Sequence, residues 1–331
     1  MRANELETGT CLGGRYVVTS LLGVGGMASV YAADDNLLGR RVALKVLRSS
    51  LRGPASIAWF VKEARALAVL DSAHLVPIYD LVWHDKTPFL VMKLLSGRTL
   101  RELLDESPQG LPQQRALAII AQLLKALSHM HRRGFVHRDI KPSNVFVAAD
   151  DHVTLVDLGI AFDSETDSGQ RGLVVGTPPY MPPEQGKGES GDARSDLYGV
   201  GLLLFESLTG RLPFAEEPGR AGALSLSPSA LTSIPPGLTD VVLRALDPDP
   251  VQRFANAAEM RARMLRVEPS RAPRGTAPPI DAPTPTPDAE TQVARGGRVR
   301  GDRSGLRRTH PDSRHLDQSR RKSGSPYPGS R

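Results

Sequence analysis

The pattern of apolar residues changes once along this chain, near Lys93, and that change restricts the folds open to it. Before Lys93, short runs of β-branched and other apolar residues alternate with Gly and Asp, which is typical of strands joined by turns in an antiparallel sheet. After Lys93, apolar residues recur at spacings of three and four, which is typical of helices with one buried face. The sequence therefore predicts strands first and helices afterwards.

One helix is expected among the strands, with Pro54 well placed in its first turn. Beyond Lys93 the longest helix is expected over 112–133, where Leu117, Ile120, Leu124 and Leu127 share one face. The predicted strands cover residues 16–18, 28–31, 42–46, 75–82 and 89–92, and the predicted helices cover 54–70, 112–133, 194–209, 237–247 and 256–266.

The composition changes again at about Glu268, where Ala-Pro, Thr-Pro and Gly-Arg combinations replace large apolar residues. Such a segment cannot bury enough surface to offset the entropy of ordering, so residues 268–331 are predicted to be disordered. From Ser270 onward lie 13 of the 42 basic and 6 of the 36 acidic residues, so this tail carries the excess positive charge. We favour a role for this tail as a solvated linker or as a docking segment for other proteins over a role in binding nucleic acid. No nucleic-acid partner is therefore assigned to it.

Cellular location is constrained by cysteine content and by hydropathy. The single cysteine, Cys11, excludes an internal disulfide and fits a reducing compartment. The N-terminal residues do not resemble a signal sequence, and no apolar run approaches the ~20 residues that cross a bilayer. We expect a cytoplasmic protein with no membrane partner.

The stretch His137-Arg138-Asp139-Ile140-Lys141-Pro142-Ser143-Asn144 places acidic, basic and amide groups at the spacing that phosphoryl transfer needs. Asp139 can accept the proton of an attacking hydroxyl, and Lys141 can neutralise charge on a moving phosphoryl group. Asn144 can hold a divalent metal, and Asp157, 18 residues after Asp139, supplies a second oxygen ligand. His-Arg-Asp alone is weak evidence, whereas the whole set followed by Asp157-Leu158-Gly159 is strong.

On these motifs the chain resembles the eukaryotic-like (Hanks-type) serine/threonine protein kinases of bacteria, over roughly residues 11–267. The resemblance implies an α+β, bilobal protein kinase fold with the active site in the cleft between the lobes. The small lobe, antiparallel and β-rich with one helix, would cover 11–92, and the larger, mainly helical lobe 93–267. Residues 1–10 would be an N-terminal extension. The implied ligands are ATP, Mg²⁺ (with Mn²⁺ as an alternative) and proteins with Ser or Thr hydroxyls.

A glycine-rich stretch is the candidate phosphate loop, because glycines allow close backbone approach and offer N–H donors. Taken alone it is equally well a plain hairpin turn. The resemblance makes it a nucleotide loop in which Ala28 replaces the usual third glycine, and we expect this replacement to tighten or stiffen the loop. The loop residues are Leu22, Gly23, Val24, Gly25, Gly26, Met27, Ala28, Ser29 and Val30. The adenine is then expected against Val30, Ala43 and Phe146, with Met92 limiting the depth of the pocket.

Lys45 ends the apolar triplet Val42-Ala43-Leu44, an unusual place for a lysine without partners. The resemblance supplies partners in the ATP phosphates and in Glu63 on the following helix. For Glu63 the alternative is a solvated helix face.

Residues beyond Asp157 resemble the activation segment of kinases. Lys141 implies serine/threonine specificity, with Thr177 expected to bridge Asp139 and Lys141. Glu184, in Pro182-Pro183-Glu184, is expected to pair with Arg253. Asp196 is expected to hold the catalytic loop from beneath. For Glu184 and Asp196 the alternative is ordinary surface charge.

Arg138 precedes Asp139, and in kinases with this arrangement a phosphate on the activation segment typically neutralises the arginine. We therefore expect autophosphorylation at Thr166, with Ser164 or Ser168 as alternates. Relatives often activate in trans through small-lobe dimers, which makes a homodimer a candidate partner. Two other function classes stay open: a catalytically weak or dead kinase-fold scaffold, and a small-molecule phosphotransferase on a related fold.

Overall fold

The computed structural model describes residues 6–157, 178–189, 191–214 and 232–267. They all belong to one compact unit. The predicted disorder of residues 268–331 lies outside the described residues.

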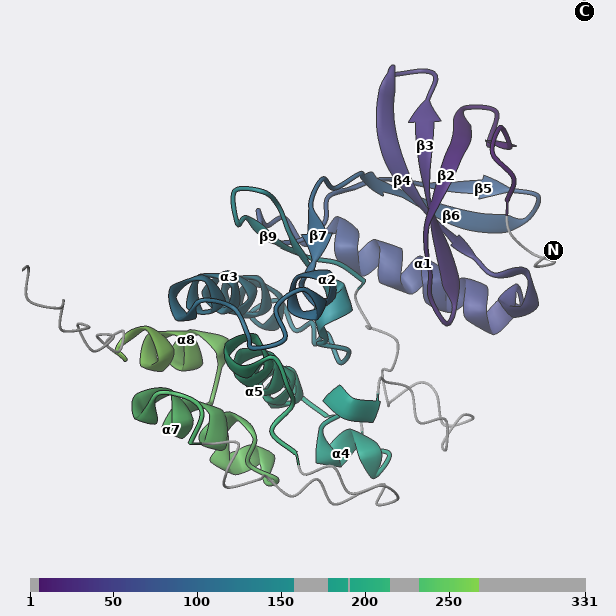
Figure 1. Ribbon diagram of the computed structural model, residues 1–331. Coiled ribbons are helices and arrows are strands. Elements are labelled where there is room, and N and C mark those ends of the chain that lie inside the picture. The colour runs from purple at the N-terminus through teal and green to yellow at the C-terminus, as the bar shows by residue number, and fades with distance from the viewer. Residues whose placement is uncertain (1–5, 158–177, 190, 215–231, 268–331) are drawn as a thin grey trace, which may run out of the picture. The chain divides into compact units, whose positions relative to one another are not determined.

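The first part of the chain forms an antiparallel sheet in which the strand order is β1-β2-β3-β4-β6-β5 (Figure 1). All five predicted strands are present, but β1 had no periodic signal because it is only two residues long. The strands are β1 (Cys11–Leu12), β2 (Tyr16–Val24), β3 (Ala28–Asp35), β4 (Arg40–Leu47), β5 (Ile78–His84) and β6 (Thr87–Lys93). Helix α1 (Pro54–Ala68) lies between β4 and β5, and Pro54 occupies its first turn as expected.

Side chains from one face of this sheet form a compact apolar core. Tyr16, Tyr31 and Leu44 are each almost fully buried in it. The ring of Tyr16 meets that of Phe89 edge to face, with centroids 5.8 Å apart. On α1, Phe60 and Leu67 are buried in the larger core that continues into the helical part.

The predicted strand over 75–82 begins only at Ile78. Leu75 forms a parallel bridge with Leu155 instead, and Val76 N–H donates to the Leu155 carbonyl at 3.2 Å. The stretch after α1 is extended, as its β-branched residues indicated, but its hydrogen bonds go to a strand of the helical part. The two parts of the unit are therefore joined by backbone hydrogen bonds as well as by the chain.

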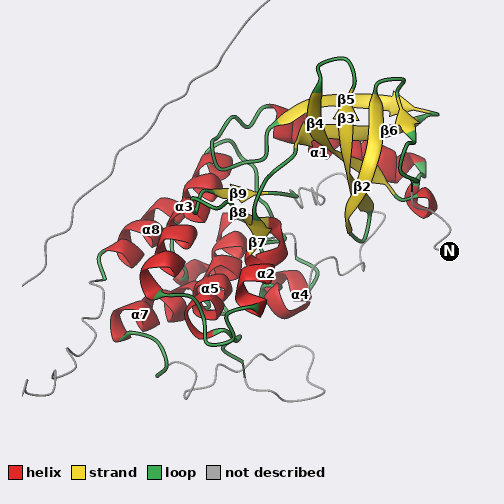
Figure 2. Cartoon of the chain, turned by 45° about the horizontal axis from the view of Figure 1, so that its top comes forward, coloured by secondary structure: helices red, strands yellow, loops and turns green. Residues whose placement is uncertain are grey.

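The helical part contains α2 (Leu100–Asp105), α3 (Gln113–His131), α4 (Pro183–Gly186), α5 (Ala193–Thr209), α7 (Pro236–Ala245) and α8 (Ala257–Leu265). The four helices predicted beyond Lys93 are confirmed to within a few residues. Helix α5 is buried on every side from Ser195 to Ser207 and packs against α3 and α7, while α8 packs against α3 and α7 in turn (Figure 2). Because α5 sits in the middle of this part, polar side chains on it can reach several other elements.

A small three-stranded sheet, of order β7-β8-β9, consists of β7 (Arg98–Thr99), β8 (Val145–Val147) and β9 (Val153–Leu155). Its strands are too short for sequence periodicity to reveal. The described residues also include the 3-10 turns η1 (Ser49–Leu51), η2 (Pro142–Asn144), η3 (Pro178–Tyr180) and η4 (Pro250–Gln252). Among the helices of the described segments, none has the length and apolar character needed to cross a membrane.

Candidate active site

The loop that joins α3 to β8 carries the His-Arg-Asp motif and is held by Asp196 of α5. The Asp196 carboxylate accepts hydrogen bonds from the backbone N–H of His137 at 2.9 Å and of Arg138 at 2.7 Å. It also lies 2.7 Å from Nε2 of His131. Burial raises the pKa of Asp196, but these donors outweigh burial and lower it overall. The predicted contact beneath the loop is confirmed.

Arg138 has a positive φ of 67°, which is unfavourable for a side chain with a Cβ. The hydrogen bond from its N–H to Asp196 offsets this cost and fixes the turn. Asp139, the next residue, is thereby presented in a single orientation.

Asp139, Lys141 and Asn144 come together as expected. Lys141 Nζ lies 2.6 Å from Asp139 Oδ2. The Asn144 amide donates to the Asp139 carbonyl at 2.9 Å and to its Oδ2 at 3.1 Å. The Asp139 side chain remains about a quarter exposed, at 27%, so a substrate hydroxyl can reach a carboxylate that is already oriented.

Lys45 of β4 contacts two carboxylates that come from different parts of the unit. Its Nζ lies 2.7 Å from Glu63 Oε1 on α1 and 3.0 Å from Asp157 Oδ1, which follows β9. Glu63 is buried, so the alternative of a solvated helix face is wrong. These contacts form a chain of opposite charges that runs from α1 through β4 to the end of β9.

The charges in this chain change one another's pKa values. Burial opposes the charged form of Lys45, but Glu63 and then Asp157 outweigh it and raise the Lys45 pKa. Lys45 in turn lowers the pKa of Asp157, whereas burial raises the pKa of Glu63 against the opposing effect of Lys45. Lys45 therefore stays positively charged and Asp157 stays ionised at neutral pH, as phosphate and metal binding require.

Asn144 and Asp157 fit a divalent metal. The β8–β9 hairpin brings their backbones together, since Val156 N–H donates to the Asn144 carbonyl at 2.9 Å. The Asp157 side chain is 46% exposed, which leaves its carboxylate accessible. Because the Asn144 amide nitrogen faces Asp139, its amide oxygen faces away from that residue. Carboxylate and amide oxygens are the hard ligands that Mg²⁺ and Mn²⁺ take.

The glycine-rich stretch is the hairpin between β2 and β3, with Gly23 opposite Val30 and Val24 opposite Ser29. The turn is closed by the Gly25 N–H, which donates to the Ala28 carbonyl at 2.8 Å. Nothing lies within 4 Å of where a Cβ would stand on Gly23 or Gly26, so the backbone is open there to an incoming group. Leu22 and Val24 are exposed on the strand that leads into the turn, and Met27 lies in the turn itself.

Ala28, at the position of the usual third glycine, is buried at the start of β3. Its methyl group is thus part of the sheet and not of the turn. We infer that the replacement leaves the turn itself free to approach phosphates.

Three of the four residues predicted to contact adenine lie in one apolar cluster. Ala43 and Met92 are buried there, and Val30 packs against them. Phe146 is not a member of this cluster and lies on β8, opposite Thr99 and close to Gly97, so its predicted contact with adenine stays a prediction. The cluster also contains Val76 and Val156, which the sequence analysis missed because each is an ordinary valine in a short segment.

The predicted pair between Glu184 and Arg253 is confirmed. The guanidinium donates to both carboxylate oxygens, at 2.7 and 2.8 Å, and both residues are buried. Ser195 adds a hydroxyl donor to Glu184 at 2.7 Å, and burial, which raises the Glu184 pKa, is outweighed by these donors. This bidentate pair fixes α4 on the helical part. Thr166 and Thr177 lie outside the described residues, so their predicted roles stay predictions.

Comparison with known proteins agrees with this geometry. Residues 16–264 match the model of the protein kinase domain family, so the chain belongs to the protein kinase family. It is 42% identical over 273 residues to the serine/threonine-protein kinase PksC of Streptomyces coelicolor, covering 77% of this chain and 49% of PksC. It is 38% identical over 294 residues to the serine/threonine-protein kinase PknB of Mycolicibacterium smegmatis, covering 84% of this chain and 46% of PknB.

A solved structure with the same fold is the PknI kinase domain of Mycobacterium tuberculosis, with a TM-score of 0.62 and 27% identity, covering 79% of this chain and 98% of that one. The chain spans about half the length of PksC and PknB. Within the protein kinase family, its relatives are therefore bacterial serine/threonine kinases of the Hanks type.

Proposed function

We propose that this chain is a protein serine/threonine kinase that transfers the γ-phosphoryl group of ATP to protein hydroxyls, including its own. The observation that carries the proposal is the position of Lys45, within 2.7 Å of Glu63 and 3.0 Å of Asp157. A phosphate bound at Lys45 would lie beside the two candidate metal ligands, Asp157 and Asn144. A catalytically dead scaffold would be expected to lack the lysine, the base or the metal carboxylate, and this chain has all three.

The roles of the residues follow from their charges and contacts. The backbone of the β2–β3 turn approaches the phosphates, and Lys45 holds them through its charge. As the oxygen of the substrate hydroxyl attacks the γ-phosphorus, Asp139 accepts the proton of that hydroxyl. The bond between the γ-phosphorus and the β-phosphate oxygen breaks. Lys141 stabilises the negative charge on the transferred group. Mg²⁺ or Mn²⁺ held by Asn144 and Asp157 would neutralise phosphate charge.

The test is transfer of labelled γ-phosphate from ATP with Mg²⁺ to the chain itself and to a generic basic protein. We expect label on serine or threonine, and a loss of about 100-fold or more in Asp139→Asn because the proton acceptor is gone. Asp150→Asn is the matched control, since Asp150 is an exposed turn residue. Retained transfer in Asp139→Asn, or label on neither amino acid, would overturn the proposal.

We also propose that a phosphate on Thr166, or on Ser164 or Ser168, neutralises charge beside Asp139 and activates the enzyme. Support comes from the position of Arg138 directly before Asp139, with its backbone already fixed by Asp196. Phosphopeptide mapping after incubation with ATP checks this, and absence of phosphate at all three positions would contradict it. Activation in trans through a homodimer, with Thr177 contacting Asp139 and Lys141, belongs to the same proposal.

A cytoplasmic location is proposed on chemical grounds. The catalytic groups require ATP, and Cys11 is an exposed free thiol that suits a reducing compartment. Cell fractionation with an antibody against the chain tests this, and recovery outside the cytoplasmic fraction would count against it.

A further inference from the structure

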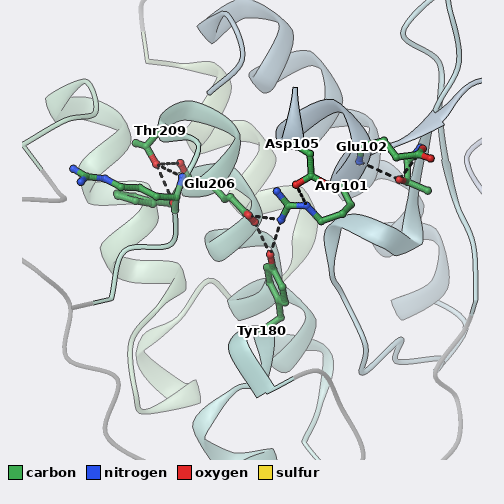
Figure 3. Close-up of polar contacts among 9 residues, drawn as sticks. Arg101, Glu102, Asp105, Tyr180, Glu206 and Thr209 are labelled. Atoms are coloured by element: carbon green, nitrogen blue, oxygen red, sulfur yellow. Dashed lines mark hydrogen bonds and ion pairs between the residues drawn. The ribbon is translucent and has the colours of Figure 1, made fainter. Parts of the chain in front are cut away.

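A second polar network lies away from the Lys45–Glu63–Asp157 chain and joins three elements that are distant in sequence. Arg101 at the start of α2 donates from Nη1 to Glu206 Oε1 on α5 at 2.7 Å. The Tyr180 hydroxyl, at the end of η3, donates to the other oxygen of Glu206 at 2.7 Å. Figure 3 shows Arg101 and Tyr180 converging on the Glu206 carboxylate.

Burial makes Glu206 dependent on Arg101. The Glu206 side chain is only 5% exposed, whereas that of Arg101 is 36% exposed. A buried carboxylate is costly unless a cation and hydrogen bonds compensate it, and among the described residues the ion pair of Glu206 is with Arg101. Burial, and then the bond to Glu206, raises the pKa of Tyr180, so its hydroxyl stays protonated and remains a donor.

The network lies at one end of the segment expected to present the substrate polypeptide. Tyr180 comes four residues before Glu184, which Arg253 holds on the helical part. Directly after Glu184, Gln185 of α4 donates to the Arg138 carbonyl at 3.4 Å, so α4 lies beside the catalytic loop. Movement of Tyr180 would therefore displace the turn that leads into α4, whose Gln185 contacts the residue before Asp139.

Arg101 is itself held by a contact within α2, the helix that follows β7. Its Nε donates to Asp105 at 2.9 Å, one turn further along α2. The capping box of α2, formed by Thr99 and Glu102, fixes the start of the helix. Arg101 thus presents its guanidinium from a short helix whose start is fixed by its own capping box.

We propose that Arg101 is a positioning residue for the polypeptide substrate. By neutralising Glu206, it allows the carboxylate to hold the Tyr180 hydroxyl, and with it the turn that leads to α4. Arg101 acts through Glu206 and Tyr180 and does not touch ATP. This inference rests on the proposed kinase function and names a residue that helps to position the protein substrate.

The test compares the kinetics of Arg101→Met for a protein substrate and for ATP. We expect kcat/KM for the protein substrate to fall about tenfold, mainly through KM, because an uncompensated buried carboxylate no longer orders the turn. The KM for ATP should stay within about twofold of the unsubstituted chain. Arg115→Met is the matched control, because Arg115 is 37% exposed and pairs at 2.9 Å with Asp151, a carboxylate that is itself 40% exposed; both parameters should be unchanged.

Two further variants separate positioning from a general loss of stability. Adding Glu206→Gln to Arg101→Met removes the uncompensated charge and keeps a carbonyl oxygen for Tyr180, so kcat/KM should recover to within about threefold. Tyr180→Phe removes only the hydroxyl and should reproduce the selective rise in protein KM.

The proposal is overturned by unchanged kinetics in Arg101→Met, by equal effects on the ATP and protein parameters, or by a double variant no better than Arg101→Met. Absence of transfer by the unsubstituted chain would instead overturn the proposed function, so the two failures are distinguishable.

Discussion

Asp35, at the end of β3, shows how a single carboxylate can fix a turn. It accepts hydrogen bonds from the Arg15 guanidinium at 2.6 and 2.7 Å and from the backbone N–H groups of Leu37 and Leu38. The Arg15 side chain is the main cause that lowers the Asp35 pKa to about 2. Nothing in the sequence marked this aspartate, because its partners lie in the turn before β2 and in the backbone of the turn after β3.

The lowered pKa gives Asp35 a predictable pH dependence. The ionised group contributes stability that is complete above its ordinary pKa of 3.8 and is lost as pH falls through about 2. The gap in unfolding free energy between the unsubstituted chain and Asp35→Asn should therefore shrink as pH falls from 5 toward 2. Denaturant titrations across this range measure it, with Asp85→Asn, 89% exposed, as the control. A gap that is constant with pH would contradict this account of Asp35.

A substitution of Arg253 tests whether its buried ion pair with Glu184 anchors α4. Its side chain is fully buried and its partner Glu184 nearly so, and removing one member of such a pair leaves an uncompensated charge. Arg253→Met is expected to lower the unfolding free energy by about 3–5 kcal/mol. Arg263→Met, whose arginine is 49% exposed and 3.7 Å from Asp240, should cost about 1 kcal/mol or less. If thermal or chemical unfolding shows equal losses of unfolding free energy in Arg253→Met and Arg263→Met, the buried pair with Glu184 does not stabilise the fold more than an exposed ion pair does.

Among the elements, α2 was not predicted, although its start signal was present in the sequence. Thr99 and Glu102 form a capping box: the Thr99 hydroxyl accepts from Glu102 N–H at 3.2 Å, and the Glu102 carboxylate accepts from Thr99 N–H at 2.7 Å. The helix is six residues long, so its apolar positions are too few to establish a period. Long helices such as α3 and α5 were predicted because their periods repeat several times.

The strands of the small sheet could not be predicted from the sequence for a different reason. Strands β7, β8 and β9 are two or three residues long, and their pairing is set by tertiary contacts. The catalytic motifs were located from spacing because those residues are close in sequence. Arg101, Glu206 and Tyr180 have no such signal, since the first two are 105 residues apart.

The capping box of α2 should contribute measurably to stability. Thr99→Ala removes the side-chain acceptor and should lower the unfolding free energy by about 1 kcal/mol. Thr99→Ser keeps a hydroxyl and should cost much less. Because α2 carries Arg101, Thr99→Ala should also raise the KM for a protein substrate, and this effect should be larger than any effect on the KM for ATP. Chemical unfolding and steady-state kinetics check the two effects, and an equal loss in Thr99→Ser would argue against the cap.

At the scale of the whole unit, the candidate active site exists only because two differently built parts meet. Lys45 belongs to the antiparallel sheet, Asp157 follows β9, and their contact at 3.0 Å joins them. The backbone bonds between the stretch after α1 and Leu155 fix the same junction. The spacing of motifs in the sequence identified the residues of the site. It could not show the Lys45–Asp157 contact, because that contact depends on this junction.

The most direct test of the central claim is the rate of γ-phosphoryl transfer from ATP to serine and threonine in Lys45→Met. The account predicts a loss of about 100-fold or more, since the charge that joins Glu63, Asp157 and the phosphates is removed. Lys125→Met, at an exposed position of α3, should transfer at the unsubstituted rate. Undiminished transfer by Lys45→Met would contradict the assignment of the active site to this junction.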